Sequence, residues 1–289
     1  MTPTGTAASI LARHEGVRRR LAVRLRIFPL LIALAPFGCS AAPAARALAP
    51  LARPRSATPD EVREAYDGYC RGLASLSVSG DLDVRDTRTG KTQKLGVRMV
   101  VARGGRLYLK GSVAIVTALE VIDNGDRFWF QVPSKKTVWT GRSDQSPDGE
   151  RDDAPYFALR PRDIVLAFLP EPLEPRDGES LLFESDRQVF SMTLAATASG
   201  AGYARRRVSL VRESLAWERS REFDEHGELQ SEISVAAFQD GLPRQVVINR
   251  PAQGYVASFA LDKIEKNGSV PERAFLGRAP EGYKVIDVP

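Results

Sequence analysis

Cys39 is the residue of this 289-residue chain whose setting indicates chemistry most directly. It follows an apolar run, Ile27–Phe37, and that run follows an arginine-rich start that includes Arg18–Arg20. A basic segment, a short apolar run and a small residue at the cut, here Gly38, are the parts of a secretory signal. A cysteine directly after the cut is the residue that bacterial lipoproteins present for acylation. The sequence therefore predicts export, followed by attachment of lipid to Cys39.

The residues just before Cys39 depart from the usual lipoprotein pattern, in which leucine stands three residues before the cysteine. Pro36 occupies that position and Phe37 follows it, while Leu34 and Ala35 resemble the pattern displaced by two residues. Two other interpretations stay open: cleavage near Cys39 without acylation, and an uncleaved anchor. The apolar run is shorter than the roughly 20 residues that a membrane-spanning helix needs.

The charge balance divides the chain at the same place. The whole chain has 41 lysines and arginines against 36 aspartates and glutamates. Residues 1–38 hold six of those arginines and one of those glutamates, which leaves 35 residues of each sign in the remainder. The remainder has no excess of positive charge of the kind that nucleic-acid binding requires, so no nucleic-acid partner is expected.

Residue types that catalytic and metal sites commonly use are scarce. The two histidines are His14, within the predicted signal, and His226, in a predicted turn. A histidine-based triad or a histidine-ligated metal site is therefore unexpected. If Cys39 is acylated, Cys70 has no disulfide partner in the chain, and a buried structural thiol is favoured. We expect no enzyme, no cofactor and no metal, with a two-carboxylate hydrolase of envelope polymer left open.

Two short helices are predicted. The first begins at Thr58, where Thr-Pro-Asp-Glu supplies a capping box and a proline at the first helical position, and it ends near Gly72. The second covers 162–169 and ends at Pro170. Each helix has one apolar face and therefore needs a surface to cover. These faces consist of Val62, Tyr66, Tyr69 and Leu73 in the first helix and of Ile164, Val165, Phe168 and Leu169 in the second.

From Leu76 onward the apolar period changes to two, which indicates antiparallel strands joined by turns that contain glycine, asparagine or proline. The segment 111–116 is apolar but interrupted by serine and alanine. It is either a buried strand or an exposed apolar loop that contacts lipid or a partner. The chain is thus divided into a signal peptide (1–38), an Ala/Pro-rich tether (39–57) and a mainly β (α+β) domain (58–289).

The order of these elements resembles the LolA/LolB superfamily of lipoprotein carriers and outer-membrane receptors, over about 59–265. Three stretches carry the resemblance: 106–141, which begins Arg-Leu-Tyr-Leu-Lys-Gly; 161–170, Pro-Arg-Asp-Ile-Val-Leu-Ala-Phe-Leu-Pro; and 240–244, Asp-Gly-Leu-Pro-Arg. LolB-like lipoproteins of this superfamily are as similar as the receptor itself. The resemblance implies a single unclosed, strongly curved antiparallel β-barrel of about 11 strands. Two or more short helices would cover its concave face.

The same resemblance implies a binding protein for acyl chains of lipoproteins or another lipid, anchored by lipid to the outer membrane and facing the periplasm. A periplasmic carrier protein would be a further partner. The two helix faces would form a lid. Val113 or Ile115 would correspond to the apolar residue that the receptor exposes for membrane transfer, although the family's Pro-Leu pattern is absent there. The strand residues lining the cavity would be Leu107, Leu109, Phe128 and Phe130.

One alternative keeps the fold and changes the ligand. A sensory or structural envelope lipoprotein of this superfamily would bind a protein partner. A stable partner together with a filled, lipid-free core would favour it over lipid carriage.

Acylation of Cys39 is directly testable. Cells expressing the chain are grown with a clickable fatty acid, and labelling is compared between the wild type and Cys39→Ala. We expect label on the wild-type chain alone, because the thiol is the acylated group. Equal labelling of the two chains, or no labelling of either, contradicts lipid attachment at Cys39.

Overall fold

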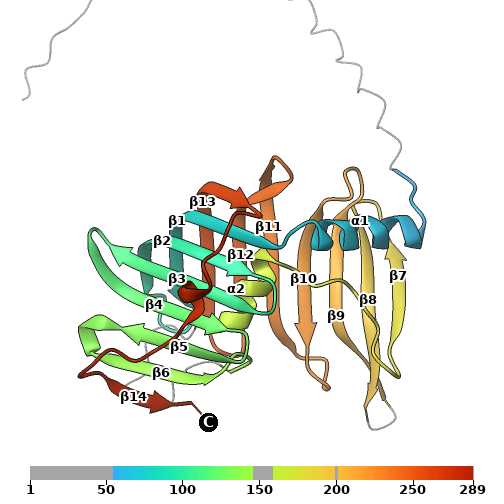
Figure 1. Cartoon of the computed structure of the whole chain (residues 1–289). Coiled ribbons are helices and arrows are strands. Elements are labelled where there is room, and N and C mark those ends of the chain that lie inside the picture. Colours follow the sequence, from blue (N-terminus) through green and yellow to red (C-terminus); the bar gives the residue numbers. More distant parts are fainter. Residues whose placement is uncertain (1–54, 146–158, 199–200, 289) are drawn as a thin grey trace, which may run out of the picture. The chain divides into compact units, whose positions relative to one another are not determined.

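A computed structural model of the chain describes residues 55–145, 159–198 and 201–288 (Figure 1). The predicted signal, Cys39 and most of the predicted tether lie outside these residues. The described helices are α1 (Pro59–Arg71) and α2 (Pro161–Phe168), with 3-10 turns η1 (Pro133–Lys135) and η2 (Glu272–Phe275). The strands are β1 (Ser75–Asp86), β2 (Thr92–Ala102), β3 (Arg106–Val113), β4 (Val116–Asn124), β5 (Arg127–Val132), β6 (Thr137–Arg142), β7 (Ser180–Ser185), β8 (Val189–Ala198), β9 (Ala201–Val211), β10 (Trp217–Phe223), β11 (Leu229–Gln239), β12 (Leu242–Arg250), β13 (Tyr255–Lys266) and β14 (Lys284–Asp287).

The described strands form one sheet in the order β14-β6-β5-β4-β3-β2-β1-β13-β12-β11-β10-β9-β8-β7. Strands β1–β6 form one antiparallel meander and β7–β13 a second, and the pair β1–β13 joins them. The sheet edges, β7 and β14, are not paired with each other, so the barrel is open. Figure 1 shows the sheet curving around α2. The expected unclosed, curved and mainly antiparallel barrel is confirmed.

Both helices form where the sequence predicts them. The Thr58 hydroxyl accepts a hydrogen bond from the backbone N–H of Glu61, and the Glu61 carboxylate accepts one from the N–H of Thr58 at 2.7 Å. This reciprocal box satisfies donors that the first turn of α1 cannot pair internally. In α2, Pro161 occupies the first helical turn, where a missing N–H costs nothing.

Two details of the sheet differ from expectation. Fourteen strands are described, where about 11 were expected. Strand β14 was not predicted; it has four residues and pairs in parallel with β6. It is too short to show a period in the sequence, and its pairing depends on where the tail returns. The segment 111–116 comprises the end of β3, a two-residue turn and the start of β4, and residues 113–116 at its tip are exposed.

A β-bulge bends β1 against β13. The register of this pair shifts between Ser79 and Gly80. A bulge bends its strand and increases the local twist, which suits a curved sheet. The backbones approach so closely that a Cβ at Gly80 would lie 2.1 Å from the carbonyl oxygen of Ala260. Glycine is therefore required here by space.

We predict that Gly80→Ala lowers the free energy of unfolding by about 1–3 kcal/mol, because the added carbon meets rigid backbone. Gly96→Ala on β2 is the matched control, since its Cβ would have no neighbour nearer than 3.9 Å. Denaturant unfolding of both variants provides the measurement. Equal stability of the two variants would contradict the close approach at Gly80.

Candidate functional site

The inner face of the curved sheet is apolar across neighbouring strands. Leu82 on β1 pairs in register with Leu95 on β2 and with Phe259 on β13. Residues in register share a face, because side chains alternate across each strand. All three side chains are buried in one continuous apolar cluster.

The four strand residues predicted to line a cavity lie on this inner face. Two of them lie on β3 and two on β5, and all four pair in register with Val121 or Asp123 of the intervening strand β4. All four are fully buried among other side chains. Their role as the lining of a ligand cavity stays a prediction. They are Leu107, Leu109, Phe128 and Phe130.

Helix α2 covers this face. It contacts β2, β3, β11 and β12, and Figure 1 places it in the hollow of the sheet. The Phe168 ring meets the Phe259 ring edge to face, with 5.2 Å between the ring centroids. The apolar residues predicted for this lid are all buried against the sheet: Ile164, Val165, Phe168 and Leu169.

Helix α1 covers other strands of the same sheet. The Tyr66 hydroxyl accepts a hydrogen bond from Arg206 of β9 at 2.8 Å, and the Tyr69 ring lies 5.9 Å from the Trp217 ring of β10. Val62 and Leu73 are buried and Tyr69 is half-buried. The two predicted lid faces therefore lie over different parts of the sheet. Cys70, in the same helix, is buried as expected, and burial raises the pKa of its thiol to about 11.

Arg103 ties the two helices together. Its Nε donates to the Leu73 carbonyl at 2.8 Å, its Nη1 donates to the Pro170 carbonyl at 3.0 Å, and its Nη2 donates to the Cys70 carbonyl. One side chain thus holds the end of α1 and the segment that follows α2. Sequence reasoning missed Arg103, because an arginine before a glycine turn carries no signal of contacts so distant in the chain.

A buried ion pair holds the start of α2. Asp163 is 1% exposed, and its Oδ2 lies 3.3 Å from Nη1 of Arg250 on β12. Burial raises the pKa of Asp163 to about 6, and the neighbouring Arg250 and Arg160 oppose that rise. Breaking such a pair is costly because one charge stays behind without a partner. Asp163 was also missed, since a charged residue beside an arginine usually marks a solvated helix face.

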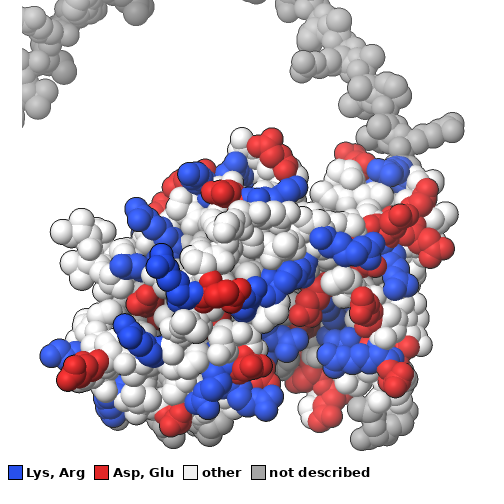
Figure 2. All heavy atoms as spheres, in the orientation of Figure 1, with Lys and Arg blue, Asp and Glu red and all other residues white. Residues whose placement is uncertain are grey.

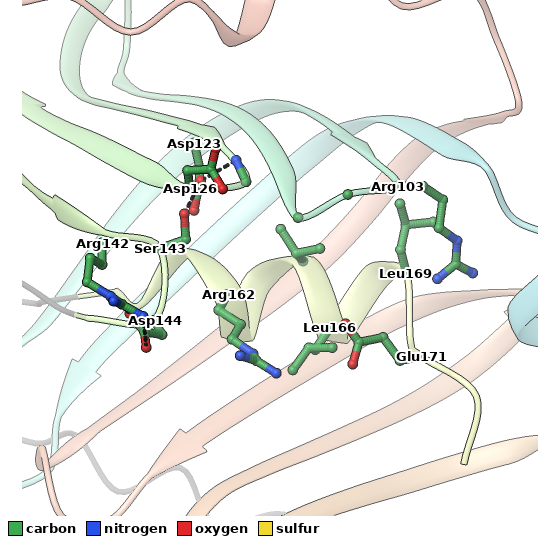
Figure 3. Close-up of a pocket in the computed structure, with 14 residues that line it drawn as sticks. Arg103, Asp123, Asp126, Arg142, Ser143, Asp144, Arg162, Leu166, Leu169 and Glu171 are labelled. Atoms are coloured by element: carbon green, nitrogen blue, oxygen red, sulfur yellow. Dashed lines mark hydrogen bonds and ion pairs between the residues drawn. The ribbon is translucent and has the colours of Figure 1, made fainter. Parts of the chain in front are cut away.

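A cavity of about 680 Å³ opens beside α2 (Figure 3). Val165, Leu166 and Leu169 form an apolar wall on the helix side. The opposite wall comes from the β2–β3 and β4–β5 turns and from the end of β6. The polar and charged residues of the lining are Arg103, Asp123, Asp126, Arg142, Ser143, Asp144, Arg162 and Glu171.

Asp123 lies where the apolar inner face meets this cavity. Its side chain is fully buried, and its Oδ1 accepts hydrogen bonds from the Gly125 N–H at 2.8 Å and the Ser143 hydroxyl at 2.6 Å. Its Oδ2 is buried and has no hydrogen-bond partner in the described ranges 55–145, 159–198 and 201–288. Burial raises the pKa of Asp123 to about 6, and the nearby Asp126 adds to that rise. The strand alternation places residue 123 inward, but the sequence alone does not say which face is inner.

The β3–β4 turn carries an exposed apolar tip. Ile115 is 99% exposed, and Val113 and Val116 are more than half exposed. Ala114 adopts a positive φ of 50°, which makes the tight turn that presents them. The tip projects at the left of Figure 1 and is uncharged in Figure 2. Both predicted contact residues, Val113 and Ile115, are thus available at the surface.

The rest of the visible face mixes acidic and basic side chains, in keeping with the balanced charge after the signal (Figure 2). Within the described residues, no histidine, cysteine or carboxylate group of three or more is placed to hold a metal ion. No described helix is both long and apolar enough to cross a bilayer.

An open, curved antiparallel sheet with helices in its hollow is the architecture that the family resemblance implied. The chain thus has the open, curved and mainly antiparallel barrel that was expected from its sequence. No protein-family model matches it, and no curated protein matches it in sequence.

Solved structures match the chain at low sequence identity. A domain described as an outer membrane lipoprotein-sorting protein, from Vibrio parahaemolyticus, is 13% identical over 74% of this chain and 94% of its own, with a TM-score of 0.48. A LolA superfamily protein from Nitrosomonas europaea is 11% identical over 77% and 99%, with a TM-score of 0.48. A DUF1329 family protein from Desulfovibrio piger is 15% identical over 74% and 97%, with a TM-score of 0.47. Likeness at this level concerns the fold alone.

The raised pKa of Asp123 predicts a pH dependence of stability. The folded state holds the proton of Asp123 more tightly than the unfolded chain does. Protonated Asp123 therefore contributes fully to stability below pH 3.8, its ordinary pKa, and this contribution is lost as the pH rises through about 6. Relative to the wild type, Asp123→Asn is therefore expected to gain stability, on the order of 2 kcal/mol, between about pH 4 and pH 7. Denaturant unfolding across that range measures the difference.

Asp177→Asn, which alters an exposed carboxylate in a turn, is the control for this experiment. Its stability difference from the wild type should stay constant with pH. A constant difference for Asp123→Asn as well would contradict the raised pKa.

Proposed function

We propose that this chain is an exported, lipid-anchored and non-enzymatic protein of the outer membrane that binds acyl chains of lipoproteins, or of another lipid, on the inner face of its open barrel. The observation that carries the proposal is the apolar inner face beneath α2, which among the described residues is covered on that side by this eight-residue helix. An apolar face of this kind binds acyl chains without any catalytic group, since each buried methylene contributes about 0.8 kcal/mol.

Acyl chains reach this face by displacing α2. In the described structure the face is filled by side chains, including those of α2 itself. Pro161 and Pro170 bound the helix, so it does not continue into its neighbours and moves as a short unit. The acyl chain then packs against the apolar side chains that α2 covers in the closed state. The polar contacts of Arg103 and Asp163 set how readily α2 leaves.

The exposed tip of the β3–β4 turn supports contact with a membrane. Singly exposed apolar residues are ordinary, but three neighbouring ones at a projecting turn suit insertion among lipid headgroups. In the proposed organisation, residues 1–38 are removed as a signal peptide, Cys39 carries the lipid, and 39–57 tether the 58–289 domain. A tether of that length reaches some tens of ångströms at roughly 3 Å per residue. A periplasmic carrier protein would deliver the ligand.

Binding of a fluorescent acyl probe tests the proposal. The full chain carrying Cys39→Ser is used, so that its own lipid does not compete. We expect saturable binding, and we expect Arg103→Gln to tighten it about fivefold or more. The glutamine breaks the hydrogen bond from Arg103 to the Pro170 carbonyl, which holds the segment after α2, and such a bond is worth about 1 kcal/mol.

Arg98→Gln is the matched control, because Arg98 is an exposed arginine on β2, the strand that leads into the turn with Arg103. Its affinity for the probe should equal that of the parent chain. Absence of probe binding by all three chains, together with no lipid detected on the purified protein by mass spectrometry, would refute acyl-chain binding.

A further inference from the structure

Two neighbouring carboxylates in the cavity beside α2 have no cationic partner within the part of the chain that the structure describes. Asp123 is fully buried with an unpaired Oδ2, and Asp126 is exposed at the same turn. Figure 3 shows the two side chains next to each other, and the charge of Asp126 helps to raise the pKa of Asp123. Among the described residues, neither forms an ion pair with an arginine or a lysine. Like charges placed together are unfavourable, so this end of the cavity fits a cation supplied by a ligand.

A single arginine in the same cavity lacks a carboxylate partner among the described residues. Arg162 lines the cavity from α2, and its guanidinium extends away from the helix (Figure 3). The other two lining arginines are engaged. Arg103 donates to backbone carbonyls, and Arg142 pairs with Asp144 at 3.2 Å. Arg162 is thus the group that remains to meet an anion, and a guanidinium binds phosphate through paired hydrogen bonds.

The third feature of the cavity is its apolar wall on α2. That wall adjoins the inner face on which acyl chains are proposed to bind, and Asp123 belongs to both surfaces. A ligand with a charged head and apolar chains could place the head in the cavity and the chains beneath α2. The volume of about 680 Å³ lies within the range of small-molecule sites, roughly 300–1,000 Å³.

We propose that this cavity binds the phosphoethanolamine head of a phospholipid whose acyl chains lie on the inner face. The proposal rests on the acyl-chain function above and specifies its ligand. The primary ammonium donates to Asp126 beside Asp123, and the phosphate accepts from Arg162. A purely anionic head would meet two carboxylates. A choline head would have no N–H to donate to them.

Binding is measured for the full chain carrying Cys39→Ser with four ligands of equal acyl chain length. These are phosphatidylethanolamine, phosphatidylcholine, phosphatidylglycerol and an uncharged monoacylglycerol. We expect phosphatidylethanolamine to bind at least tenfold more tightly than the other two phospholipids. Asp126→Asn should remove most of that preference. Arg162→Gln should weaken both zwitterionic lipids several-fold, and neither substitution should alter binding of the monoacylglycerol.

Two exposed residues far from the cavity in the sheet order provide matched controls. Asp177→Asn and Arg187→Gln make the same changes of charge before β7 and in the β7–β8 turn. Both should keep the parent preference. A loss of preference in these controls would overturn the assignment to the cavity.

The ligand series separates the two proposals. Equal affinity for the three phospholipids, with monoacylglycerol still bound, overturns the headgroup site and leaves acyl-chain binding standing. Failure to bind any of the four ligands overturns acyl-chain binding itself. Soluble glycerophosphoethanolamine serves as the head without chains. If it binds as tightly as the phospholipid and Asp126→Asn weakens that binding, the headgroup site is supported, but its ligand is a free phosphoester. If it binds much more weakly than the phospholipid, a membrane lipid is supported as the ligand.

Discussion

An open barrel must cover its own concave face. The inner residues of β1–β5 and β11–β13 form a continuous apolar surface, and leaving it in water would cost about 25 cal/mol for each square ångström. Because β7 and β14 do not meet, the sheet cannot enclose that surface by itself. Two short amphipathic helices therefore complete the core. The other features of the candidate site depend on these covering helices. A helix that is not part of the sheet can be replaced on the apolar face by another apolar group, which is the basis of the proposed function.

Polar contacts decide how firmly the cover is held. The apolar contacts of α2 are nondirectional and equally available to an acyl chain. The hydrogen bond from Arg103 to the Pro170 carbonyl and the Asp163–Arg250 pair are directional, and both depend on α2 lying in place. In the proposed function, the core therefore supplies affinity for apolar ligands in general, while a few buried polar groups set the free-energy cost of displacing α2. In the proposed headgroup site, charged groups at the rim of the face discriminate between heads attached to similar chains.

Local elements could be read from the sequence because their signals are local. The capping box at Thr58 and the apolar period of the first helix specify α1, and strand alternation specifies which residues share a face. The β3–β4 tip was identified as a candidate but not resolved, since an apolar turn and a buried strand have the same composition. β14 was missed because a four-residue parallel strand has neither a period nor a hairpin turn to mark it.

The sequence by itself determined the predicted export signal, the balanced charge of the remainder, the two amphipathic helices and the alternating strands. Each of these follows from residue types at short spacing. Only the tertiary structure decided that Arg103 forms hydrogen bonds to the segments after both helices and that Asp163 pairs with Arg250. The same holds for the position of Asp123 on the inner face at the edge of a cavity. These contacts join residues brought together by register and curvature, and a pattern of period two or 3.6 contains no information about which distant strands become neighbours.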